Sequence, residues 1–116
     1  MLQLKPEIPF EDFQKLDVRV GTIISCEPMA GSDKLFKLRV ELGELGEKQV
    51  MTGLRPWYSH QDLINLKTLF ILNLPPRKMM GEISEGMILA VDGEVESDKP
   101  ILIHLPIESQ NGAILR

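Results

Sequence analysis

Alternating apolar and polar residues dominate the first half of the chain and predict β-strands. Residues 18–27 and 34–42 have the period of two that is expected of strands with one buried face. Residues 28–33 form the loop between them, 43–47 carry glycines suited to a hairpin connection, and 48–52 return as a third strand. The residues expected to share the buried faces are Val18, Val20, Thr22, Ile24, Cys26, Phe36, Leu38 and Val40.

A short helix interrupts this strand pattern in the middle of the chain. Ser59 is followed three residues later by Asp62 and then by apolar residues, which is typical of a capped helix N-terminus. The helix is limited to about two turns, because residues 67–74 resemble a strand that a Pro-Pro pair ends. Residues 86–91 predict a fifth, buried strand, and 101–105 a shorter one.

Five main strands with a short helix between the third and the fourth match the OB-fold pattern. We therefore expect an all-β protein, a five-stranded OB-fold barrel with short helices and a C-terminal extension. Gly21 predicts a bulge or tight bend inside the first strand. The length of 116 residues suits a single domain, with a core at about 10–91 and an extension at about 92–116.

The charge of the chain is acidic but unevenly distributed. The net charge of −4 argues mildly against nucleic acid as a partner. However, removing four acids that cluster at 92–98 from the 17 in the chain leaves 13, equal to the number of bases. Residues 63–81 contain bases and no acid, so a local basic patch is expected there. The four clustered acids are Asp92, Glu94, Glu96 and Asp98.

Signals for catalysis, metal binding or membrane insertion are missing from the sequence. The single cysteine, Cys26, forms no intrachain disulfide, and its expected role is that of a small buried hydrophobe. Two histidines and one cysteine make no zinc pattern. No phosphate loop or nucleophile elbow is present, so we expect no catalytic residue, cofactor or metal. No apolar stretch suits a signal peptide or a membrane span, so a cytoplasmic location is expected.

The segment at 73–89 has the composition of a nucleic-acid-binding surface. A stiff Pro-Pro pair leads into two cations, Arg77 and Lys78, which are followed by the adaptable apolar side chains of Met79 and Met80. Cations suit phosphates, and an apolar platform suits a base or a ribose. On this evidence alone, a solvated connection whose methionines plug the end of the barrel explains the segment equally well.

Two polar side chains extend this candidate surface. Ser84 offers a hydroxyl, and Asn73 offers an amide that could read the edge of a base. Trp57 and Tyr58 suggest base stacking, but packing of the Trp57 ring under the short helix is the favoured interpretation.

Five motifs in order resemble the tRNA-binding domain shared by stand-alone tRNA-binding proteins and the C-terminal extension of bacterial methionyl-tRNA synthetases. The similarity covers residues 10–91. The motifs are DVRVG at 17–21, SDKL at 32–35, GLRPWY at 53–58, NLPPRKMMG at 73–81 and SEGMIL at 84–89.

This resemblance implies an OB-fold, homodimerisation and non-catalytic binding at the outer corner of the L-shaped tRNA, with little dependence on sequence. The apolar stretch at 101–116 then has a role in dimer contact or in covering the barrel. The residues that the resemblance places on or near the tRNA are Lys34, Asn73, Arg77, Lys78, Met79, Ser84 and Met87.

Two departures from the family pattern bear on affinity. Thr52 stands where many members have serine, which is a mild change. Glu85 stands where some relatives have glutamine, so an acid is expected close to Arg77 and Lys78, where it could weaken affinity or orient the bases.

Two other functions fit the same resemblance. The chain could be a tRNA-binding subunit or appended domain that serves a methionyl-tRNA synthetase. It could also be a secretion-related peptide-binding chaperone, although those relatives have a Gln-Ile pair in place of Lys78 and Met79. The expected partners are therefore tRNA, a second copy of the chain and, in the first alternative, a synthetase.

Overall fold

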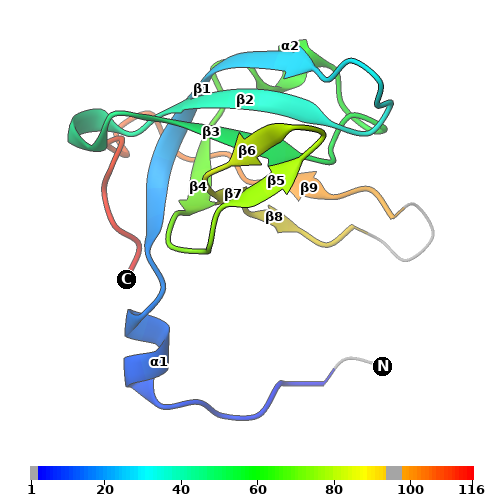
Figure 1. Cartoon of the computed structure of the whole chain (residues 1–116). Helices are drawn as coiled ribbons and strands as arrows, with labels where there is room; N and C mark the ends of the chain where they lie inside the picture. The colour runs from blue at the N-terminus through cyan, green and yellow to red at the C-terminus, as the bar shows by residue number, and fades with distance from the viewer. Residues whose placement is uncertain (1–2, 94–97) are drawn as a thin grey trace.

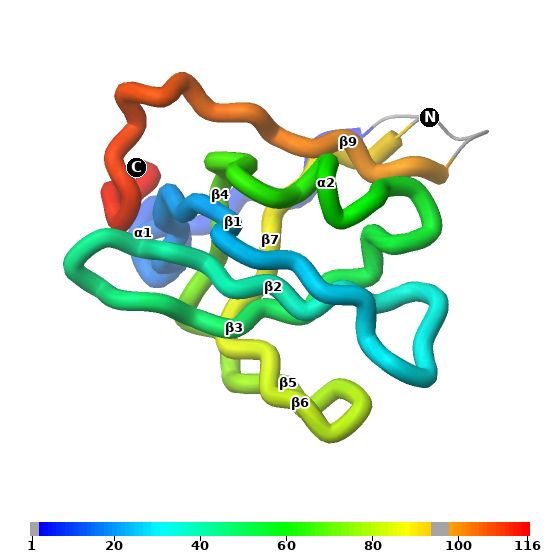
Figure 2. The backbone as a smooth tube through the Cα atoms, turned by 90° about the horizontal axis from the view of Figure 1, so that it is seen from above, coloured from blue at the N-terminus to red at the C-terminus, as the bar shows by residue number. Residues whose placement is uncertain are grey.

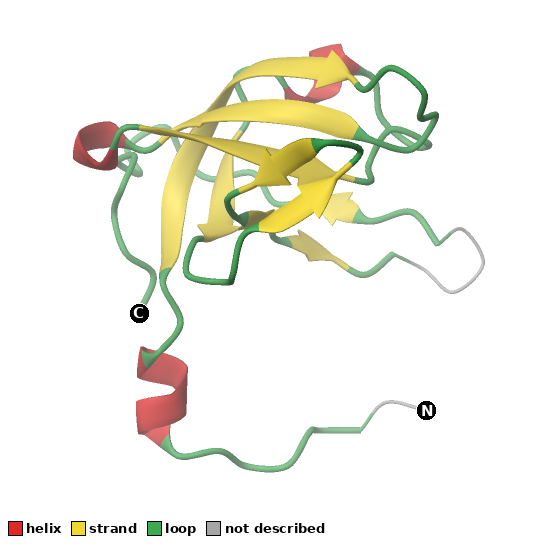
Figure 3. Ribbon diagram, in the orientation of Figure 1, coloured by secondary structure: helices red, strands yellow, loops and turns green. Residues whose placement is uncertain are grey.

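The computed structural model describes residues 3–93 and 98–116 and is built mostly of β-strands (Figure 1). Strands form the body of the molecule and the helical turns lie at its margins, which confirms the predicted all-β class (Figure 3). In chain order the elements are α1 (Phe10–Gln14), β1 (Val18–Pro28), β2 (Phe36–Glu41), the 3-10 turn η1 (Gly43–Leu45), β3 (Glu47–Thr52), α2 (His60–Leu63), β4 (Lys67–Ile71), β5 (Arg77–Met79), β6 (Glu82–Ser84), β7 (Met87–Ile88), β8 (Ala90–Val91) and β9 (Ile101–Leu102).

The main sheet has five antiparallel strands in the order β3-β2-β1-β4-β7 (Figure 2). The long strand β1 belongs to both halves of this sheet. Its first part, Val18 to Thr22, pairs with β4, and its second part, Thr22 to Pro28, pairs with β2. Because one strand serves both neighbours, it must bend in the middle, and this bend curls the sheet into a barrel.

The bend passes through Gly21, as the sequence predicts. A Cβ atom at Gly21 would lie 2.7 Å from Cγ1 of Val40, 2.9 Å from Cδ2 of Leu42 and 3.0 Å from Cδ2 of Phe70. These three side chains are fully buried in the core. Only glycine therefore fits where the backbone of β1 passes directly over the packed core.

The bulge itself lies three residues beyond Gly21. The pairing of β1 with β2 shifts between Ile23 and Ser25, so Ile24 is the extra residue. Before the shift, Ile23 is fully buried, whereas Ile24, expected on the buried face, is 42% exposed. The extra residue returns the strand to the predicted phase, so Cys26 is buried. The predicted alternation is therefore wrong from Thr22 to Ile24 and correct again at Cys26.

The barrel closes where the free edge of β3 meets the segment after β6. The N–H of Glu85 donates to the carbonyl of Gln49 at 2.8 Å. In return, the N–H of Gln49 donates to Oε1 of Glu85 at 3.0 Å, and the N–H of Met51 donates to Oγ of Ser84 at 3.0 Å. The expected five-stranded barrel is confirmed, and side chains provide part of its last seam.

Helix α2 covers one end of the barrel with a single turn rather than the predicted two. The N–H of Ser59 donates to Oδ2 of Asp62 at 2.8 Å, as the capping signal predicts. The fully buried Leu63 plugs the core. Helix geometry stops at Ile64, which is extended, and at Asn65, whose φ of 70° is left-handed.

Strand predictions after the Pro-Pro pair need correction. The single strand expected at 86–91 is two short strands, of which β7 pairs with β4 and β8 pairs with β9. Residues expected to be irregular instead form the hairpin β5–β6. Its two-residue turn places Met80 at φ 51° and Gly81 at φ 83°, as a tight hairpin with matching twist requires. The sequence did not predict this hairpin because the turn is Met-Gly rather than the usual Asn-Gly.

The C-terminal extension completes the edge of β1 that β2 does not reach. The N–H of Gly112 donates to the carbonyl of Val20 at 2.8 Å, and the N–H of Val20 donates to the carbonyl of Ala113 at 3.0 Å. The N–H of Leu115 donates to the carbonyl of Val18 at 2.8 Å. This part of the extension is therefore bound to the barrel.

We expect Gly21→Ala to lower the free energy of unfolding by about 1–3 kcal/mol, because the added methyl group overpacks the core. Urea denaturation measures the change. The control is Gly53→Ala, since the nearest atom to a Cβ there is 4.0 Å away, and its effect should stay within about 0.5 kcal/mol. Equal losses in the two variants would contradict the close approach at Gly21.

Candidate nucleic-acid interface

The hairpin β5–β6 carries one wall of a mostly apolar pocket beside the closing seam. Side chains alternate along β5, so Arg77 and Met79 point to one face and Lys78 to the other. The first face looks into a pocket of about 140 Å³. The residues that line this pocket are Met51, Leu74, Pro75, Arg77, Met79, Ser84, Gly86 and Met87.

Four of the seven predicted site residues meet in this pocket. Arg77 and Met79 reach it from β5, Ser84 from the end of β6 and Met87 from the start of β7. These residues come together because the hairpin folds back and the next strand starts at once. The arrangement offers one cation at the rim of an apolar surface that can receive a base or a ribose.

Lys78 lies on the opposite face of the hairpin and does not line the pocket. It is exposed and pairs across the hairpin with Ile83, which is also exposed. The two adjacent cations of the sequence therefore point to different faces. A ligand must reach both faces of the hairpin to contact both Arg77 and Lys78.

Ser84 uses its hydroxyl within the fold. It is buried, accepts a hydrogen bond from the N–H of Met51 at 3.0 Å and donates to the carbonyl of Gly86 at 2.9 Å. The group that the sequence offers to a ligand thus holds the pocket together.

Asn73 is likewise occupied, outside the pocket. Its Oδ1 accepts from the N–H of Asp17 at 2.9 Å, and its Nδ2 donates to the carbonyl of Lys15 at 2.6 Å. The amide therefore fixes the connection between α1 and β1 to the end of β4.

Lys34 lies in a separate loop that approaches the tip of the hairpin. Its side chain is exposed and outside the pocket. A Cβ at Gly31 would lie 3.4 Å from Cε of Met80, so the loop and the tip are neighbours. The guanidinium of Arg55 donates to the carbonyls of Met29 and Ser32 and holds this loop. Sequence reasoning did not identify Arg55, whose role depends on contacts between distant segments.

The departure at Glu85 does not place an acid on the candidate cations. Its carboxylate lies 3.7 Å from Nζ of Lys48 and accepts from the N–H of Gln49. Over residues 3–93 and 98–116, neither Arg77 nor Lys78 forms an ion pair. Two acids of the predicted acidic cluster, Glu94 and Glu96, lie outside the described residues.

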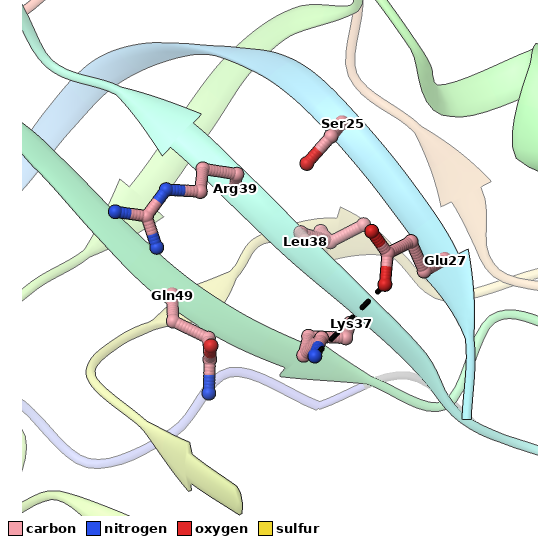
Figure 4. Close-up of a pocket in the computed structure, with 6 residues that line it drawn as sticks. All are labelled: Ser25, Glu27, Lys37, Leu38, Arg39 and Gln49. Atoms are coloured by element: carbon pink, nitrogen blue, oxygen red, sulfur yellow. Dashed lines mark ion pairs between the residues drawn. The ribbon is translucent and has the colours of Figure 1, made fainter. Parts of the chain in front are cut away.

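A second, polar hollow lies on the outer face of β1, β2 and β3 (Figure 4). Its volume is about 160 Å³, and Lys37 and Arg39 project into it from the middle strand. Glu27 approaches Lys37 from β1 at 3.9 Å, and Glu47 binds Arg39 at 2.8 Å. The residues that line this hollow are Ser25, Glu27, Lys37, Leu38, Arg39 and Gln49.

Two further side chains settle questions that the sequence raised. Trp57 is 37% exposed, whereas its neighbour Tyr58 packs against the core and donates its hydroxyl to the carbonyl of Pro100 at 2.6 Å. Tyr58, rather than the predicted Trp57, is therefore the aromatic side chain that packs against the core. Cys26 is buried as expected; this burial and the nearby Glu27 carboxylate raise its pKa to about 11.

The described part of the chain carries neither a metal-ligand cluster nor a membrane-spanning helix. No three His, Cys, Asp or Glu side chains are grouped as metal ligands there. None of its helices is long and apolar enough to cross a membrane.

Residues 18–113 match the family model described as a putative tRNA-binding domain. This match covers most of the chain, including the pocket and the C-terminal extension as far as residue 113. The chain belongs to the tRNA-binding domain family. The resemblance that the five motifs carry is therefore confirmed.

The related proteins include methionine–tRNA ligases and their relatives on the one hand and chaperones named CsaA on the other. The methionine–tRNA ligase of Clostridium acetobutylicum is 45% identical over 116 residues, all of this chain but only 18% of the ligase. A MetRS-related protein from Pyrococcus horikoshii has a similar structure, with a TM-score of 0.88, 30% identity and coverage of 97% of this chain and 100% of that one. The structure of the chaperone CsaA from Bacillus anthracis is also similar, with a TM-score of 0.81 and 31% identity. The match covers 96% of this chain and 100% of that one.

We expect Ser84→Ala to lower the free energy of unfolding by about 1–3 kcal/mol, because the N–H of the buried Met51 loses its acceptor. Urea denaturation gives the value. Ser25→Ala is the matched control, since Ser25 has no hydrogen-bond partner for its hydroxyl among the described residues. A stable Ser84→Ala protein would show that the hydroxyl does not hold the seam.

Proposed function

We propose that this chain is a non-catalytic tRNA-binding protein that recognises the outer corner of tRNA by shape and backbone charge. The observation that carries the proposal is the pocket at the closing seam, where Arg77, beside Met79 and Met87, has no ion pair within the described part of the chain. Arg77 binds a phosphate, and the methionines receive the apolar face of a base or ribose.

The charges support recognition by shape rather than by general attraction. Lys37, Arg39 and Lys48 are each paired with a carboxylate, so few cations near the pocket are available to phosphates. Lys78 and Lys34 extend the contact on either side of the pocket, from the other face of the hairpin and from the neighbouring loop. Binding with few phosphate contacts should depend only modestly on salt.

We expect Arg77→Ala to lower the affinity for unfractionated tRNA about tenfold at 0.1 M salt and to reduce the salt slope by about 1, since one phosphate contact is lost. Lys78→Ala should have the same effect if tRNA wraps both faces of the hairpin. Fluorescence titrations at several salt concentrations measure both quantities.

The matched controls are Lys5→Ala and Arg116→Ala, which remove the same charge from exposed positions near the two chain ends. Their salt slopes should stay at the wild-type value. A wild-type protein that does not bind tRNA at low salt would refute the proposal. Equal losses in the controls would show that only net charge matters.

We further propose that the working form is a homodimer. The arm at 3–16 stands away from the barrel and carries apolar side chains to solvent (Figure 1). Phe10 is 69% exposed, and Ile107 and Leu115 of the C-terminal extension are exposed as well. Exposed apolar side chains of this kind are best covered by a second copy of the chain.

We expect light scattering at tens of micromolar to give twice the chain mass of 13.1 kDa. The variant Phe10→Asp/Phe13→Asp should run as a monomer with an intact barrel, because neither ring belongs to the core. A wild-type monomer at that concentration would contradict the dimer.

Two other assignments remain as alternatives. Similarity to part of a methionine–tRNA ligase supports a subunit or appended domain that delivers tRNA to a synthetase. Likeness to a chaperone, together with the methionine-lined pocket, supports peptide binding. Suppression of aggregation of a client protein, without tRNA binding, would favour the chaperone. In each case a cytoplasmic location is proposed.

A further inference from the structure

The carboxylate of Glu82 occupies an anion-binding position on the outer face of the barrel. Its Oε1 lies 3.6 Å from Nζ of Lys37. Its Oε2 accepts from Nε2 of Gln49 at 2.9 Å. One oxygen thus faces a cation and the other an amide donor. The two free oxygens of a phosphodiester accept the same pair of contacts.

This position continues the candidate tRNA surface. Glu82 lies opposite Met79 in the hairpin, on the face that Arg77 and Met79 share. Lys37 and Gln49 line the polar hollow, and Met51, which pairs with Lys37, lines the apolar pocket. Glu82 therefore stands between the two hollows. An RNA backbone that continues from Arg77 would cross β2 and β3 at this position.

The ion pair between Lys37 and Glu82 is long. Charge-assisted contacts in a tight pair are about 2.7–2.9 Å, whereas Lys37 stands 3.6 Å from Glu82 and 3.9 Å from Glu27. The side chains of Lys37 and Glu82 are 30% and 38% exposed, so both are accessible to solvent. An exposed ion pair of this kind contributes little stability and can be exchanged.

We propose that Glu82 is an internal competitor for RNA phosphate. In the free protein it satisfies Lys37 and Gln49, and a bound phosphate must displace it into solvent. Glu82 thereby lowers affinity for polyanions that contact only this face, and it leaves binding dependent on the pocket at Arg77. The inference rests on the proposed tRNA binding.

The test measures tRNA affinity and salt slope for Glu82→Gln, which keeps the shape of the side chain and removes its charge. We expect about three- to fivefold tighter binding at 0.1 M salt, the range set by an exposed ion pair. The gain should shrink as the salt concentration rises, because salt screens the Lys37–Glu82 ion pair that competes with phosphate in the wild type. Glu82→Thr, which suits a strand, repeats the test if the first variant unfolds early in urea.

Two comparisons make the outcome specific. Glu44→Gln gives the same change in net charge at an exposed position in η1, outside both hollows, and it should leave affinity unchanged. In a Lys37→Gln background, Glu82→Gln should give no gain. An equal gain from Glu44→Gln, a gain that survives in Lys37→Gln, or no gain at all would overturn the inference. Loss of wild-type binding would instead refute the proposed function, and the inference with it.

Discussion

The seam between β3 and the segment at 84–86 is the constraint on which the rest of this structure depends. An open edge at β3 would leave the N–H groups of Gln49 and Met51 unpaired. Glu85 and Ser84 satisfy them with side-chain oxygens. Because the seam uses residues that directly follow the hairpin, closure of the barrel also sets the hairpin against the outer face. The candidate pocket is thus a consequence of how the barrel closes.

The distribution of charge explains how an acidic chain can be suited to a polyanion. Cations on the sheet are matched by carboxylates of neighbouring segments, as Lys48 is by Glu85 and Arg39 is by Glu47. Such pairs are weak and screened by salt. They nevertheless reduce the field that would draw in any polyanion, and in the proposed function the contacts made by Arg77 in a shaped pocket become decisive. In this arrangement net charge is a poor guide to the ligand.

Apolar surface is distributed unevenly between the two ends of the chain. The C-terminal extension binds the edge of β1 through residues 112–115, whereas the arm at 3–16 has no such strand to join. Asn73 holds only the last part of the arm. Among residues 3–93 and 98–116, the rings of Phe10 and Phe13 pack on each other but not in the core. Phe10 is 69% exposed to water, which is the physical basis for expecting a second copy.

The sequence by itself determined the strands β1 to β4, the place of α2, the bend at Gly21 and the family, because alternation, capping and short motifs are local signals. Tertiary structure decided the bulge at Ile24, the splitting of residues 86–91 and the hairpin turn at Met80, since these depend on which strand is the neighbour. It also decided the fate of the site residues. Four of the seven meet in one pocket, but the side chains of Ser84 and Asn73 form hydrogen bonds with distant backbone atoms. No local pattern reports the bonds to Met51, Asp17 and Lys15, because they join residues more than thirty positions apart in the chain, whereas the bond from Ser84 to Gly86 is local.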